Sequence, residues 1–182
     1  MIELSFGQKY DEKTGLIMPW FTHGALYEIK SMDLSDKNVL MYGAGLGDAW
    51  LASRCKDLAV IERNPQWVRC AATNLTHHIR PCNDCEGKDE YYLAFPEGFE
   101  PDVIISDDAY RYEAVVKAVE YFKNKKGGGI LICDNYNQDY VWRCPKALEL
   151  LEPFEKHIHI QEDHRDFETE DGMWKTAIIF IK

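Results

Sequence analysis

Hydrophobic and polar residues follow two alternating patterns along the chain. Short, almost unbroken apolar runs are typical of strands in a buried sheet, and they predict strands at 39–42, 58–61, 91–94, 101–107, 130–133, 157–160 and 173–181. Apolar residues at helical spacing predict helices at 24–32, 46–55, 65–75, 112–126 and 140–151, the last with a break at Pro145. Strands that alternate with helices indicate an α/β protein.

The last two apolar runs are separated by a polar, acidic stretch at 161–172. This connection is too short for a crossover helix, so we expect the two strands to pair antiparallel. The predicted fold is an α/β, doubly wound sheet of seven strands, mostly parallel with an antiparallel last strand. At 182 residues the chain fits a single domain, in which 1–36 form an N-terminal cap and helix and 37–182 form the sheet core.

A glycine-rich turn joins the first two predicted strands. Gly43, Gly45 and Gly47 follow the first strand at alternate positions, and Glu62 closes the second strand. Glycine lets the backbone pass close to a ligand because it has no Cβ, and a helix behind the turn presents free N–H groups and a positive dipole end. An acid after the second strand can accept both hydrogen bonds of a ribose diol. This stretch is therefore half of a nucleotide-binding unit.

Asp48 indicates which of two classes of ligand this unit binds. Dinucleotide sites use G-x-G-x-x-G with the pyrophosphate over the helix end, whereas this chain has G-x-G-x-G and an acid where the third glycine would stand. A carboxylate there disfavours a phosphate and suits a ligand with a cationic end, such as S-adenosylmethionine. The turn, preceded by the aromatic Tyr42, resembles the first motif of the class I (Rossmann-like) methyltransferases. An NAD-linked oxidoreductase is the alternative interpretation.

Other segments are similar to this family: Pro19-Trp20-Phe21-Thr22, the Glu-x-Asn-Pro-x-Trp segment at 62–67, and Asp134-Asn135. The resemblance implies a Rossmann-like sheet with a reversed last strand and S-adenosylmethionine as the cofactor. The cofactor-binding residues that it implies are Tyr42, Gly43, Ala44, Gly45, Gly47, Glu62, Arg63, Asp107, Trp20 and Thr22. For the Pro-Trp-Phe-Thr segment, the alternative is a hydrophobic staple in which Thr22 caps the following helix.

Acids follow the fourth predicted strand, at the edge where doubly wound sheets bind ligands. This segment resembles small-molecule methyltransferases and lacks the Pro-Pro-aromatic motif of the enzymes that methylate amino groups of nucleic acids. We therefore expect methyl transfer to a small-molecule acceptor, at oxygen. The candidates for a general base are Asp107, Asp108, Tyr110 and His23. A module that binds the cofactor without chemistry is the alternative function.

A divalent metal is a second alternative at this edge. Catechol-type O-methyltransferases bind an ion with an acid after the fourth strand and Asp-Asn after the fifth, and Asp107, Asp134 and Asn135 fit that spacing. Residues at strand ends also cap loops, however, and the residues at 136–138 do not match that group. The expected site therefore contains no metal.

The six cysteines are interpreted as free thiols, as in other cytoplasmic proteins. His78, Cys82 and Cys85 are residue types that zinc accepts. Pro81 and the Asn-Asp pair at 83–84 equally predict ordinary turn chemistry in a loop that leads to the third strand.

Charge and hydropathy narrow the range of partners. A net charge of −10 disfavours nucleic acid. No apolar run approaches the roughly 18 residues of a membrane span, and the first residues lack the basic start and apolar block of a signal peptide. We expect a cytoplasmic protein with no membrane segment and a small-molecule partner. A homo-oligomer in which a second subunit completes the site is an alternative arrangement.

Overall fold

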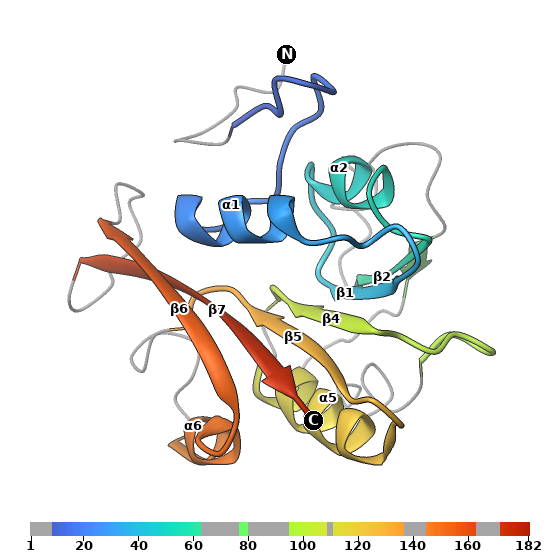
Figure 1. Ribbon diagram of the computed structural model, residues 1–182, viewed down its shortest axis with the longest axis vertical. Coiled ribbons are helices and arrows are strands. Elements are labelled where there is room, and N and C mark those ends of the chain that lie inside the picture. Colours follow the sequence, from blue (N-terminus) through green and yellow to red (C-terminus); the bar gives the residue numbers. More distant parts are fainter. Residues whose placement is uncertain (1–8, 63–76, 80–94, 109–110, 137–144, 163–171) are drawn as a thin grey trace.

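A single sheet runs through the part of the chain that the structure describes. The structure is a computed structural model, and it describes residues 9–62, 77–79, 95–108, 111–136, 145–162 and 172–182. The strands are β1 (Asn38–Tyr42), β2 (Asp57–Glu62), β3 (His77–Ile79), β4 (Val103–Ser106), β5 (Gly129–Cys133), β6 (Glu155–Glu162) and β7 (Met173–Ile181). They form a seven-stranded sheet in the order β3-β2-β1-β4-β5-β7-β6 (Figure 1).

Most neighbouring strands are parallel. β1 pairs in parallel with β2 and β4, β2 pairs with β3, and β4 pairs with β5. β7 lies between β5 and β6 and runs antiparallel to both. The predicted α/β class is confirmed, as is the mostly parallel sheet with antiparallel pairing at the C-terminal strands.

Helices cover both faces of the sheet. They are α1 (His23–Ser31), α2 (Asp48–Ala52), α5 (Arg111–Asn124) and α6 (Pro145–Leu151), and Figure 1 shows α1 and α2 on one face with α5 and α6 on the other. Met41 of β1 belongs to the core under α1 and α2, whereas its neighbour Leu40 belongs to the core under α5 and α6. Burial on both faces explains why the strand is an unbroken apolar run. None of the described helices is long and apolar enough to cross a membrane.

Several elements differ from the sequence predictions. α2 is shorter than the predicted 46–55, and the Ser53 hydroxyl at its end donates to the Trp50 carbonyl, a local bond that competes with helical pairing. α6 is described from Pro145, a residue that suits a first helical turn, and the remaining part of that predicted helix, 140–144, lies outside the described residues. The strand beside β2 is His77–Ile79, where a loop was predicted. The predicted helix at 65–75 and strand at 91–94 lie outside the described residues.

Asp11 ties the N-terminal segment to two helices. One carboxylate oxygen lies 2.9 Å from Lys30 Nζ of α1, and the other accepts the Trp50 indole N–H of α2 at 2.8 Å. Both Asp11 and Trp50 are buried. The hydrogen bonds from Lys30 and Trp50 hold the pKa of Asp11 well below its usual range.

We expect Asp11→Asn to destabilise the protein more at neutral pH than in acid. A lowered pKa in the folded state stabilises it above the pKa of the unfolded chain, about 3.9 for aspartate. That contribution is lost as the pH falls through the lower pKa of the folded state. Urea unfolding at pH 7 and pH 3 should therefore show a smaller difference between wild type and variant at pH 3. Asp36→Asn, which removes an exposed carboxylate, is the control, and an equal loss at both pH values would contradict the prediction.

Candidate functional site

The parallel strands end at one edge of the sheet, called here the carboxyl edge. Gly43 follows β1, Glu62 ends β2, Asp107 follows β4 and Asp134 follows β5. β1 lies between β2 and β4, so the strand order reverses beside it, and open α/β sheets bind ligands at such a point. The Asp107 N–H donates to the Tyr42 carbonyl at 3.0 Å. The turn after β1 and the loop after β4 are therefore in direct contact.

The three glycines of the turn have different surroundings. Gly43 has φ +94°, and a Cβ there would overlap the Asp107 carbonyl oxygen. A Cβ on Gly47 would overlap the backbone of Pro19. A Cβ on Gly45 would meet no atom of the described residues within 4 Å, and the backbone there has no positive φ. Gly43 and Gly47 are thus required by the fold, and the Cβ position of Gly45 faces space that no described residue fills.

Two carboxylates accept hydrogen bonds from backbone N–H groups of this turn. Glu62 Oε2 accepts the Ala44 N–H at 2.7 Å, and Asp48 Oδ1 accepts the Gly45 N–H at 3.1 Å. Both acids are buried. A phosphate over the turn would meet two negative charges and would compete for donors that are already bonded. With only five residues, α2 also supplies a weaker dipole than the sequence suggested. The turn therefore favours a ligand without phosphate.

The segment 18–22, called here the strap, connects the glycine turn to β7. Pro19 packs against Gly47, and Phe21 is buried in the core under α1. The Thr22 N–H donates to Thr176 Oγ1 of β7 at 3.0 Å. Trp20 is partly exposed. The strap thus spans the carboxyl edge with its two ends fixed.

His23 is the first residue of α1 and follows the strap directly. It is exposed, and its backbone N–H donates to Gln161 Oε1 of β6 at 2.7 Å. Partial desolvation, followed by the charge of Lys9, lowers the pKa of His23 below its usual value. This shift favours the neutral imidazole, which is the form that can accept a proton.

Asp107 forms an ion pair that the sequence analysis did not predict. Arg111 Nη2, at the start of α5, lies 2.7 Å from Asp107 Oδ1, and Nη1 donates to the Asp108 carbonyl. The Arg111 side chain is 9% exposed and that of Asp107 is 24% exposed. Asp107 ends a predicted strand and Arg111 precedes the predicted helix at 112–126, so no helical spacing in the sequence indicated this pair. Tyr110, between them, lies outside the described residues, as does Arg63 after β2.

Comparison with known proteins identifies the fold. No protein-family model and no curated protein matches the sequence. The N-methyltransferase NodS of Bradyrhizobium japonicum WM9, in complex with S-adenosyl-L-homocysteine, matches with a TM-score of 0.59 at 15% identity, over 87% of this chain and 86% of NodS. The fibrillarin pre-rRNA processing protein of Methanococcus jannaschii matches with a TM-score of 0.54 at 20% identity, over 96% and 83% of the two chains.

A third similar structure is precorrin-6y C5,15-methyltransferase of Geobacter metallireducens GS-15. Its TM-score is 0.53 at 15% identity, over 96% of this chain and 100% of that protein. The chain has the fold of the S-adenosylmethionine-dependent methyltransferases. Within this methyltransferase fold, the named proteins differ in the molecules on which they act.

The Asp134 carboxylate, after β5, accepts hydrogen bonds from two side chains of β7. Its Oδ1 accepts the Trp174 indole N–H at 2.9 Å and the Thr176 hydroxyl at 2.7 Å, and the residue is 2% exposed. Asn135 follows with φ +51°. Within the described ranges, no three His, Cys, Asp or Glu residues are grouped to hold a metal. Asp134 therefore acts as an internal acceptor for β7. Cys82 and Cys85, of the zinc alternative, lie outside the described residues.

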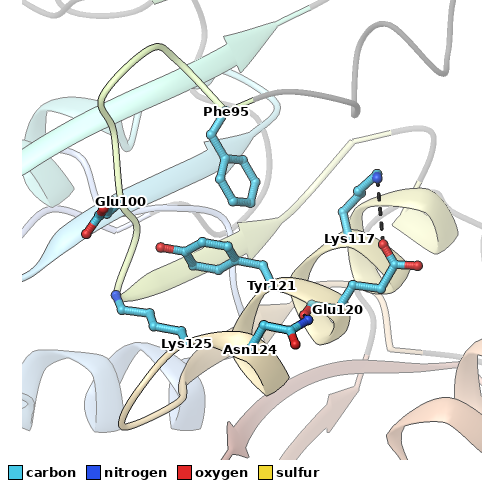
Figure 2. Close-up of a pocket in the computed structure, with 7 residues that line it drawn as sticks. All are labelled: Phe95, Glu100, Lys117, Glu120, Tyr121, Asn124 and Lys125. Atoms are coloured by element: carbon cyan, nitrogen blue, oxygen red, sulfur yellow. Dashed lines mark hydrogen bonds and ion pairs between the residues drawn. The ribbon is translucent and has the colours of Figure 1, made fainter.

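A cavity of about 490 Å³ lies against the outer side of α5 (Figure 2). The rings of Phe95 and Tyr121 pack edge to face there, with their centroids 4.8 Å apart. Lys117 Nζ lies 3.6 Å from Glu120 Oε2. Lys125, at one end of the cavity, binds Asp102, which precedes β4. The cavity thus lies toward the end of β4 opposite Asp107 and is separate from the carboxyl edge.

Proposed function

We propose that the protein transfers a methyl group from S-adenosylmethionine to a small-molecule acceptor, at an oxygen atom. The observation that carries this proposal is the open side of the turn at Gly45, beside Glu62 and at the reversal point of the sheet. The two acids that bond the turn disfavour a phosphate-bearing cofactor such as NAD. NodS, which shares the fold, holds S-adenosylhomocysteine, the product of such a transfer.

The proposed cofactor site is built from the turn and the end of β2. Backbone atoms of the turn receive the methionine part, where the absence of a Cβ at Gly45 leaves room. Glu62 accepts hydrogen bonds from the ribose hydroxyls. The residues in these roles are Tyr42, Gly43, Ala44, Gly45, Gly47 and Glu62.

The strap and the β4 loop complete the proposed site. Trp20 and Thr22 cover the methionine end. Asp107, whose carboxylate is oriented by Arg111, faces the cofactor ammonium group. Arg63 is assigned to the adenine.

The chemistry is an in-line displacement, in which an acceptor oxygen bonds to the methyl carbon as the carbon–sulfur bond breaks. When bound, the cofactor would supply the methyl group, and its sulfur would keep the bonding electron pair as a neutral thioether. The protein mainly aligns the groups and excludes water. The acceptor hydroxyl proton passes to a base. Of the candidates His23, Asp107, Asp108 and Tyr110, we assign this role to the exposed His23, because Asp107 already pairs with Arg111.

S-adenosylhomocysteine should raise the melting temperature, and NAD should not. A ligand at 100 times its dissociation constant adds about 2.7 kcal/mol, which corresponds to a rise of roughly 5–10 °C for a chain of this size. Glu62→Gln keeps an acceptor for the Ala44 N–H but removes the charge that strengthens bonds to the ribose. We expect about tenfold weaker binding for this variant.

Glu149→Gln, on the exposed side of α6, is the matched control and should bind as wild type does. A rise with NAD and none with S-adenosylhomocysteine would overturn the proposed function.

A further inference from the structure

Helix α1 begins without help from its own N-cap side chain. The first N–H groups of a helix have no partner within the helix, and a Ser, Thr, Asp or Asn at the N-cap normally bonds one of them. Thr22 occupies the N-cap with extended backbone, at φ −55° and ψ 147°, but makes no such bond. Its Oγ1 is buried and has no hydrogen-bond partner among the described residues. The prediction that Thr22 stands at the N-cap position is therefore confirmed, but the side-chain bond of the capping alternative is not formed.

Side chains from two strands bond these N–H groups instead. Thr176 Oγ1 of β7 accepts the Thr22 N–H at 3.0 Å, and Gln161 Oε1 of β6 accepts the His23 N–H at 2.7 Å. Both bonds join segments that are more than a hundred positions apart in the sequence. The start of α1 is thus capped by residues of the antiparallel strand pair.

The Thr176 bond is oriented by a buried network. The Thr176 hydroxyl donates its only proton to Asp134 Oδ1 at 2.7 Å, which leaves an oxygen lone pair for the Thr22 N–H. The Trp174 indole N–H bonds the same Asp134 oxygen at 2.9 Å. Thr176 is fully buried, and Asp134 and Trp174 are nearly so. A buried, mutually bonded network of this kind holds one geometry.

We propose that Thr176 and Gln161 are positioning residues, which cap α1 from β7 and β6 and thereby fix His23 and the strap at the carboxyl edge. The inference rests on the proposed function, since it gives these residues a part in cofactor binding and proton transfer. It also gives the reversed strand a local role, because β7 places Thr176 beside the end of β5, where Asp134 lies.

Thr176→Val tests the proposal with an almost unchanged shape. Valine removes the hydroxyl, so the Thr22 N–H loses its partner and the strap loosens. S-adenosylhomocysteine should then bind about tenfold more weakly by titration calorimetry. The NMR titration midpoint of His23, assigned with His23→Gln, should rise toward the ordinary histidine value as the imidazole becomes more hydrated. Thr176→Ser keeps the hydroxyl. Its affinity for S-adenosylhomocysteine should stay within about threefold of wild type, and its His23 midpoint should stay within a few tenths of a pH unit of wild type.

Ile179→Val is the matched control, because it shortens a buried side chain of the same strand in the opposite core. It should change neither the affinity nor the His23 midpoint. Gln161→Ala removes the second cap from a partly exposed position and should raise the His23 midpoint even if Thr176→Val fails to fold.

The two possible failures can be told apart. If wild type does not bind S-adenosylhomocysteine, the proposed function fails, and the His23 midpoint alone then decides the positioning. If wild type binds but Thr176→Val and Gln161→Ala keep wild-type affinity and midpoint, the positioning proposal is overturned.

Discussion

Gly43→Ala is expected to lower the melting temperature by roughly 6–12 °C. Gly43 has φ +94°, a conformation that costs other residues about 1–3 kcal/mol. The new Cβ would also overlap the Asp107 carbonyl oxygen, which is backbone and cannot swing aside. The combined loss should reach about 3 kcal/mol or more, and thermal unfolding measured without ligand will show it.

Gly45→Ala supplies the matched comparison two residues further on. No described atom lies within 4 Å of a Cβ at this position, and the backbone suits alanine. Its melting temperature should stay within about 2 °C of wild type. Equal losses in the two variants would contradict the different roles assigned to the two glycines.

Asp134→Ala should destabilise the protein by roughly 2–5 kcal/mol. The change leaves the Trp174 indole N–H and the Thr176 hydroxyl without the acceptor that both use. Both groups are buried, so water cannot readily replace the carboxylate. Urea unfolding of wild type and variant measures the difference.

Asp134→Asn is the control, since both donors bond the same carboxylate oxygen and an amide oxygen in its place can still accept from both. We expect it to lose less than half as much stability as Asp134→Ala. A small loss for Asp134→Ala would mean that the carboxylate does not organise the end of β7, and it would also weaken the case for Thr176 as a positioning residue.

Local patterns predicted most of the sheet. The apolar runs of β1 and β4 are unbroken because both faces are buried, and that signal lies in the sequence itself. The short connection at 161–172 limited β6 and β7 to antiparallel pairing, as observed. β3 was missed because its three residues are too few to show a period. The predicted range of α2 was too long, because helical spacing of apolar residues does not reveal the hydrogen bond of the Ser53 hydroxyl that competes with the helix.

The site could be predicted where its residues adjoin strand ends. Gly43, Glu62 and Asp107 were expected at one edge of the sheet, and the strand pairing places them there. The contacts of Thr22 with Thr176 and of Asp134 with Trp174 join residues 154 and 40 positions apart. No local pattern encodes such pairs, because they depend on which strands become neighbours.

The most direct test of the proposed cofactor site is a calorimetric titration of S-adenosylhomocysteine into wild type and Gly45→Ala. The alanine methyl group would project into the space beside the turn that no described residue fills, while the fold stays intact. We expect saturable binding to wild type and at least about tenfold weaker binding to Gly45→Ala, with unchanged melting temperatures in the absence of ligand. No binding to wild type, or equal affinity in the two proteins, would contradict a cofactor site at the carboxyl edge.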